Sequence, residues 1–250
     1  MTMTLKFTLR SVIAVSVIGA FLFAAQASYA QAAKPPLLET ASRRSQNAAK
    51  TIKVITAMPE DEALPAELWK RAKAIGVFPD VVKMSLMFSQ AMKAYGVICS
   101  RQPEGWSLPA YYGFGSSEMN LKIASFKSFD LVILFMNENT VKWFQKGALE
   151  FKGIRSGVAG PIGKLTREAE NELQGANIIL YALVDGKLRG INLESNSWTI
   201  VAGVNPDNNI NKAVYGIKGR EVLEGKAPKT TSNVSDVTAF RDILNEKFPK

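Results

Sequence analysis

The segment best suited to bind an anion is a glycine-rich run from Gly153 to Lys164. Four cations lie in or beside this run: Lys152, Arg155, Lys164 and Arg167. The backbone amides of a glycine-rich turn, together with such cations, can hold an anionic headgroup. The alternative interpretation is that these cations are separate charges on a solvated surface.

The end of this run, Gly163-Lys164, partly matches a nucleotide-binding phosphate loop. That loop requires a glycine five residues before its second glycine, and Ser or Thr directly after the lysine. Val158 and Leu165 occupy those two positions here. We therefore expect no nucleotide binding, and we interpret the glycines as residues that permit a tight backbone turn between sheet elements.

A second set of cations is predicted to lie on one face of an amphipathic helix that ends at about Met58. At 100° per residue the opposite face is apolar, with Val54 the one misplaced residue. Such a helix can lie in a membrane interface, or it can dock its apolar stripe on the domain. Both alternatives stay open. The apolar stripe comprises Leu37, Leu38, Ala41, Ala48, Ala49, Ile52 and Ile55, and the basic face comprises Arg43, Arg44, Lys50 and Lys53.

The residue inventory excludes several kinds of catalysis. The chain has no histidine and one cysteine, Cys99, which excludes Ser-His-Asp and Cys-His catalysis and the usual zinc sites. Cys99 lies in an apolar run, where cysteine is usually a small buried hydrophobe. Glu118 and Asp130 lie near predicted strands, but no spacing brings them together as an acid–base pair. We therefore expect no enzyme activity, no cofactor and no metal site. The alternatives that this inventory leaves open are a Ser-Lys enzyme and a carboxylate-based hydrolase, which would need two convergent acids.

Five aromatic residues could mark a surface that faces a membrane or a ligand, since Trp and Tyr suit interfaces. We favour core filling for most of them. The residues concerned are Trp106, Tyr111, Tyr112, Trp143 and Trp198.

The first 30 residues have the three-part pattern of a cleavable secretory signal. Lys6 and Arg10 precede an apolar stretch from Val12 to Ala25, and Ser28-Tyr29-Ala30 supplies small residues for cleavage after Ala30. An N-terminal membrane anchor is the alternative, but ~14 apolar residues fall short of the ~20 that span a bilayer. The sequence predicts a periplasmic or secreted protein, with a linker at 31–36 and one domain at 37–250.

The charge of the chain favours anionic partners. Its net charge is +9, and removal of residues 1–30, which hold two cations and no acid, leaves +7. A basic surface suits phospholipid headgroups, nucleic acid or polyanionic glycans. Predicted export makes nucleic acid the least expected of these partners, and we expect none.

The elements that position these residues read as an α+β fold with a largely antiparallel, curved or barrel-like sheet. Short apolar runs punctuated by Gly and Pro predict antiparallel strands, and the unbroken run 131–135 predicts a central strand buried on both faces. Asp185-Gly186 predicts a hairpin turn, and Asn139 is a candidate N-cap for the helix that follows it. Further strands are predicted at 75–79, 95–100, 106–112, 121–126, 178–184, 188–193 and 198–202, and further helices at 64–74 and 235–248.

Several blocks, in their order and spacing, resemble the SYLF domain family. The likeness covers roughly residues 40–217 and is carried by Ala48-Ala49-Lys50, the stretch from Leu64-Pro65 to Pro79, Tyr95-Gly96-Val97, Gly105 to Pro109, Asp130 before its apolar strand, Gly157 to Lys164, Gly190 to Glu194 and Tyr215-Gly216. The chain departs from the family pattern where glycines are usual, at Met87 to Lys93, at Gly115-Ser116-Ser117 and at Leu121-Lys122-Ile123.

The resemblance implies a membrane-lipid-binding domain without known catalytic activity. In eukaryotic members lipid binding is associated with an amphipathic N-terminal segment, which implicates the basic helix face defined above. Actin binding belongs to the eukaryotic side of the family and is not expected here. We expect an exported, peripheral protein on anionic phospholipid. The alternative is an envelope protein-interaction or stress-response module without lipid binding, and burial of Leu37, Ile52 and Ile55 would favour it.

Overall fold

A computed structural model describes residues 36–85, 90–117, 128–145, 149–150, 157–192, 202–228 and 235–249. These residues confirm the predicted α+β class with its largely antiparallel sheet. The predicted signal and linker lie outside the described residues, except for Pro36. Within the described part of the chain, no helix is both long and apolar enough to span a membrane.

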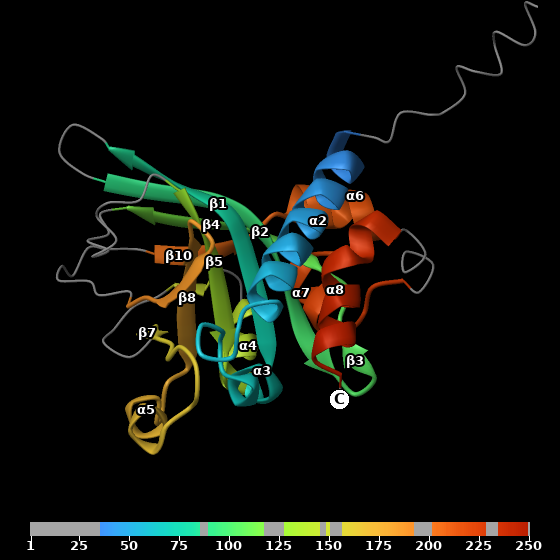
Figure 1. Cartoon of the computed structure of the whole chain (residues 1–250). Coiled ribbons are helices and arrows are strands. Elements are labelled where there is room, and N and C mark those ends of the chain that lie inside the picture. The colour runs from blue at the N-terminus through green and yellow to red at the C-terminus, as the bar shows by residue number, and fades with distance from the viewer. Residues whose placement is uncertain are drawn as a thin grey trace, which may run out of the picture. The chain divides into compact units, whose positions relative to one another are not determined.

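The sheet is one path of strands in the order β6-β10-β4-β2-β1-β5-β8-β7, with β3 added to β2 and β9 to β8 (Figure 1). Among the described strands, β7 alone runs parallel to its neighbour, β8. The strands are β1 (Ala74–Ser85), β2 (Gln90–Gln102), β3 (Gly105–Trp106), β4 (Ala110–Ser117), β5 (Ser128–Phe135), β6 (Leu149–Glu150), β7 (Val158–Ala159), β8 (Ile178–Val184), β9 (Lys187–Gly190) and β10 (Ala202–Pro206).

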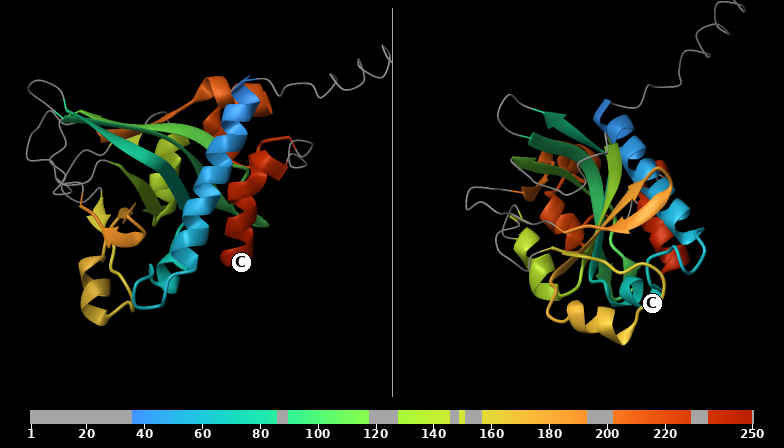
Figure 2. Two further views of the ribbon diagram at one scale, coloured as in Figure 1. Left: turned by 45° about the horizontal axis from the view of Figure 1, so that its top comes forward. Right: turned by 60° about the vertical axis from the view of Figure 1, so that its left-hand side comes forward.

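Helices cover both faces of this sheet. The predicted N- and C-terminal helices, α2 (Pro36–Thr56) and α8 (Ser235–Lys247), pack together on one face, and α4 (Glu138–Gln145) lies on the other (Figure 2). Helix α7 (Gly219–Leu223) contacts α4, β2 and β4. The remaining helices are α3 (Ala66–Arg71), α5 (Arg167–Glu172) and α6 (Asn208–Tyr215).

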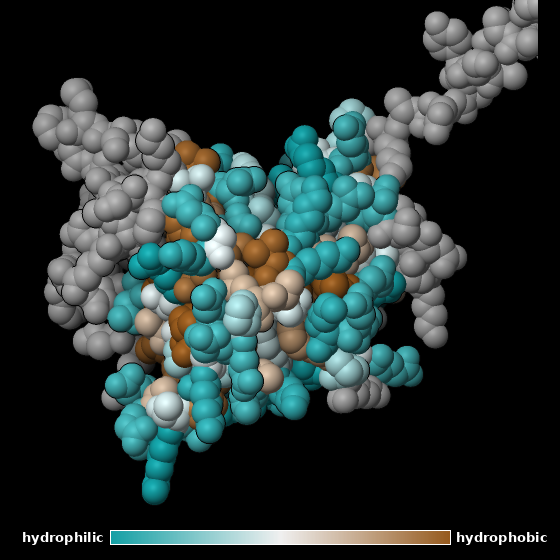
Figure 3. Space-filling model, viewed as in Figure 1, coloured by the Kyte–Doolittle hydropathy of each residue, from teal (hydrophilic) through white to brown (hydrophobic). Residues whose placement is uncertain are grey.

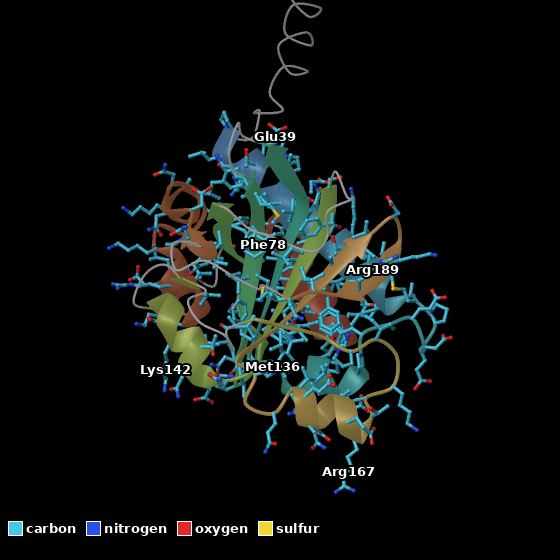
Figure 4. The ribbon with its side chains drawn as sticks, turned by 90° about the vertical axis from the view of Figure 1, so that its left-hand side faces the viewer. Glu39, Phe78, Met136, Lys142, Arg167 and Arg189 are labelled. Carbon is cyan, nitrogen blue, oxygen red and sulfur yellow. The ribbon has the colours of Figure 1, made fainter. Side chains whose placement is uncertain are left out.

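The centre of the sheet follows the sequence pattern closely. The five residues Leu131 to Phe135 of β5 are all at most 1% exposed, which confirms a strand buried on both faces. Phe78 of β1 lies among the strands (Figure 4) and is fully buried. The β8–β9 hairpin turns at Asp185 and Gly186, whose φ angles of 49° and 75° are those of a type I′ turn.

Other boundaries differ from prediction. The strand predicted to end at Pro79 continues to Ser85, because a β-bulge with Asp80 at φ 53° lets the pairing resume at Val82. Asn139 is not the N-cap of α4. Asn137 has that role, since its Oδ1 accepts from the Thr140 N–H at 2.8 Å. The segment predicted as one strand over 106–112 is divided between β3 and β4.

The aromatic residues considered for a rim belong mostly to the core. Trp106, Tyr111 and Tyr112 are at most 5% exposed. The Trp143 side chain and Trp198 lie outside the described residues, as does the strand predicted at 121–126.

Candidate functional site

Helix α2 is docked on the domain. Ile52 and Ile55 are fully buried, as are the small residues of the predicted stripe, while Leu37 is 43% exposed. Burial of each isoleucine contributes about 1.5–3 kcal/mol. The apolar stripe therefore faces the protein interior, which favours the interaction-module alternative, with Leu37 the exception.

Polar contacts fix the helix in place along its length. Arg44 Nη1 lies 2.9 Å from Asp207 Oδ2. Thr51 Oγ1 donates to Asp130 Oδ2 at 2.6 Å. The Phe240 N–H of α8 donates to Ser45 Oγ at 3.0 Å. These contacts reach three different partners, so the orientation of α2 about its own axis is set.

Asp130, singled out in the sequence as a possible acid, has a structural role. Its Oδ1 accepts from the Asp80 N–H at 3.0 Å, within the bulge of β1, while Oδ2 accepts from Thr51. One carboxylate thus joins β5, the β1 bulge and α2. Glu118 lies outside the described residues.

The four cations predicted on α2 separate into two groups. Arg43, Lys50 and Lys53 are exposed, and none forms an ion pair with another described residue. The Arg44 side chain is only 14% exposed. It pairs with Asp207, and its guanidinium carbon lies 4.4 Å from the centroid of the Tyr95 ring. Because Arg44 is engaged internally, the freely exposed charge of the predicted site comes from the other three residues.

The exposed large hydrophobic residues gather beside those cations. In the described part of the chain there are four: Leu37 and Val54 on α2, Val82 on β1 and Tyr95 on β2, each 43–48% exposed. Val82 faces Lys93 across the strands, and Lys93 Nζ lies 5.2 Å from the Tyr95 centroid. Since Tyr95 also contacts Arg44 of α2, these strand residues lie on the α2 side of the sheet.

We call this surface the α2 face. Figure 3 views it directly and shows hydrophobic patches among hydrophilic residues. Sequence reasoning missed the strand residues of this face. The antiparallel pairing of the consecutive strands β1 and β2 brings Val82 next to Lys93. The α2 face consists of Leu37, Arg43, Lys50, Lys53, Val54, Val82, Lys93 and Tyr95.

The described members of the second predicted group of cations lie before and on α5, and not on α2. Lys152 and Arg155 lie outside the described residues, while Lys164 and Arg167 are exposed. Figure 4 shows Arg167 at the far end of the domain from Glu39, which lies in the first turn of α2. Acidic residues surround this second region: Glu170 pairs with Arg71 at 2.9 Å, and Glu168 and Glu172 lie on the same short helix.

The glycine-rich run is used for close packing. A Cβ at Gly160 would lie 1.9 Å from Tyr181 Cζ, and a Cβ at Gly190 would lie 2.0 Å from the Gly160 carbonyl oxygen. The Tyr181 hydroxyl donates to the Pro161 carbonyl at 3.1 Å. Gly163, at φ 78°, donates its N–H to the Ala63 carbonyl at 2.8 Å. The described part of the run leads from β7 to helix α5, so these contacts show close packing in place of the predicted turn between two sheet elements.

The remaining candidates for chemistry are the single cysteine and clusters of metal-binding side chains. Cys99 is fully buried, and burial raises the pKa of its thiol well above the ordinary value, so the thiolate nucleophile is suppressed. Within the same residues no group of three or more acidic, cysteine or histidine side chains is arranged to hold a metal ion.

Fold and site together define an α+β domain that carries a docked basic helix at its surface. Residues 123–246 match the family model Ysc84, described as Las17-binding protein actin regulator. The chain therefore contains a Ysc84 domain, of the SYLF family, over those residues. No curated protein matches the chain. The match begins after β4, so α2, β1 and β2 precede it.

Proposed function

We propose that the protein associates peripherally with anionic phospholipid surfaces through the α2 face. The observation that carries this proposal is that exposed hydrophobic side chains and exposed basic side chains occur on the same surface. Among the described residues, all four exposed large hydrophobic side chains lie on α2 or on the strands beside it, intermixed with Arg43, Lys50, Lys53 and Lys93. Interspersed cations and apolar side chains are the composition of a membrane-interface surface.

The cations supply most of the attraction. A basic residue near an anionic membrane surface contributes about 1 kcal/mol, and this attraction decays within a Debye length. Val54 and Tyr95 supply shallow contacts, and tyrosine suits the headgroup level because its ring is apolar and its hydroxyl polar. In this arrangement α2 stays docked, since Ile52 and Ile55 remain inside the domain.

Export is part of the same proposal. The predicted signal at residues 1–30 would place the domain in the periplasm or outside the cell, where phospholipid surfaces are available and nucleic acid is not. The family description names an actin regulator that binds Las17. Because of the predicted export, we do not extend either interaction to this chain.

A protein-interaction module is the second candidate. The buried stripe of α2 favours it, because a docked helix leaves the α2 face as an exposed mixed patch of the kind that also binds proteins. A negative result in the experiment below would favour this candidate.

Co-sedimentation with vesicles tests the proposal. The full chain after signal cleavage is mixed with phosphatidylcholine vesicles, with or without phosphatidylglycerol, from about 50 to about 500 mM NaCl. We expect binding only to the anionic vesicles and a steady loss of binding with salt. Absence of binding at the lowest salt would contradict lipid association. Equal binding at all salt concentrations would contradict its electrostatic basis.

A further inference from the structure

The Tyr95 ring brings together cations from two separate elements. Arg44 of α2 places its guanidinium carbon 4.4 Å from the ring centroid, and Lys93 of β2 places Nζ at 5.2 Å. Two cations held against one partly exposed ring concentrate positive charge where the headgroups would lie. Arg offers planar donors that suit phosphate oxygens, and Lys adds a compact point charge.

Strand β4, which pairs with β2, carries two glycines beside this ring. Gly113 and Gly115 of β4 pair with Tyr95 and Lys93 respectively, so they lie next to those side chains. A Cβ at Gly113 would be in ordinary contact with the Tyr95 ring, at 3.6 Å, whereas a Cβ at Gly115 would meet nothing within 4 Å. The position on β4 beside Lys93 is therefore not filled by a side chain.

Asp207 holds the Arg44 guanidinium in the unbound protein. Asp207 Oδ2 lies 2.9 Å from Arg44 Nη1, and Oδ1 accepts from the Ile210 N–H at 3.4 Å as the N-cap of α6. Their side chains are 14% and 21% exposed, so the pair lies at the boundary of the solvent. An anion on the α2 face would compete with this carboxylate for the same donors.

We propose that Arg44, Lys93 and Tyr95 form a subsite for the phosphate of a lipid headgroup, and that Asp207 occupies Arg44 until a headgroup displaces it. This inference rests on the proposed function and identifies the residues that would contact a headgroup directly. Arg43, Lys50 and Lys53 would supply general attraction, whereas this subsite would supply a directed contact. Asp207 would lower the affinity for membranes through an internal, competing ion pair.

Asp207→Asn tests whether vesicle affinity depends on release of Arg44 from its ion pair or only on the net charge of the surface. Asparagine is as good an N-cap as aspartate, so α6 keeps its cap while Arg44 loses its anionic partner. Glu172→Gln, on the exposed surface of α5, makes the same change in net charge far from α2. On phosphatidylcholine–phosphatidylglycerol vesicles we expect Asp207→Asn to bind about fivefold more tightly than the starting protein, and Glu172→Gln to differ by less than about 1.5-fold.

The increase in vesicle affinity caused by Asp207→Asn must also depend on Arg44. In an Arg44→Gln background, Asp207→Asn should change vesicle affinity by less than about 1.5-fold, because the competing cation is gone. Circular dichroism melts of the starting protein and all four variants establish that each is folded. If Asp207→Asn and Glu172→Gln raise affinity equally, or if the gain survives in Arg44→Gln, the subsite is wrong while the proposed function stands. If the starting protein binds no anionic vesicle, both proposals fall.

Discussion

At the scale of single residues, glycines that partly match a phosphate-binding loop allow close packing against neighbouring residues. The glycines predicted a tight turn between sheet elements, whereas Gly160 in the described part of the run packs closely against Tyr181. Tyr181 lies one strand away from Gly160, and that neighbourhood is created by the parallel pairing of β7 with β8. A local sequence contains no information on such a long-range contact.

Substitution of Gly160 tests this packing. Gly160→Ala places a methyl group inside the Tyr181 ring, so we expect a loss of about 1–3 kcal/mol in the free energy of unfolding, or failure to fold. Gly115→Ala, where the space is open, should change stability by less than about 1 kcal/mol. Urea denaturation measures both. Equal effects of the two substitutions would show that the close approach at Gly160 is absent.

Buried titratable groups predict a loss of stability in alkali. Burial raises the pKa of Tyr111, Tyr181, Tyr215 and Cys99 above the ordinary values. The unfolded chain deprotonates these groups at pKa values of about 8.5 to 10, so above this range it binds fewer protons than the native state. The free energy of unfolding must then fall as pH rises, by about 1 kcal/mol per tyrosine near pH 11.

Urea midpoints between about pH 8 and about pH 11 check the sign of this effect. Tyr111→Phe removes one of the titrating groups and should make the decline shallower. A midpoint that stays constant over this range would contradict the burial of these hydroxyls.

At the scale of elements, the α2 helix was the most predictable feature. Its 100° periodicity placed Ile52 and Ile55 on one arc and Arg43, Lys50 and Lys53 on the other, and the structure has the same division. The position of Arg44 was not predictable. It lies at the edge of the polar arc, and its burial depends on Tyr95 and Asp207, which are distant in the chain.

Opposite faces of α2 should respond differently to substitution. Ile52→Ala removes fully buried methyl groups and should cost about 2–5 kcal/mol of stability. Val54→Ser, at a site 45% exposed, should change stability by less than about 0.5 kcal/mol but weaken vesicle binding. Denaturation and co-sedimentation on the same two variants provide the comparison. A stable Ile52→Ala variant that no longer binds vesicles would mean that the stripe inserts and that α2 undocks.

The elements that sequence reasoning missed are short or depend on local geometry. Helices α6 and α7 have eight and five residues, too few for a periodic pattern to stand out. The β1 bulge at Asp80 follows a proline that would ordinarily end a strand. Asn137 and Asn139 are equally good N-caps by type, and only the hydrogen bond to Thr140 distinguishes them.

At the scale of the whole domain, half of the candidate site could be predicted. Its helical half follows from periodicity, whereas Val82, Lys93 and Tyr95 join it through strand pairing. Arg167, on α5 among acidic side chains, lies at the opposite end of the domain from the first turn of α2. The account therefore predicts that a membrane is contacted by one face, and that equal numbers of charges elsewhere have little effect.

Two charge-matched triple variants test this claim most directly. The first is Arg43→Ser, Lys50→Ser and Lys53→Ser. The second is Lys142→Ser, Lys164→Ser and Arg167→Ser, whose residues are also exposed but lie on α4 and before or on α5. At about 1 kcal/mol per lost cation, the first should weaken binding to phosphatidylglycerol-containing vesicles by about a hundredfold, and the second by less than about threefold. Equal losses in the two variants would contradict a membrane contact through the α2 face.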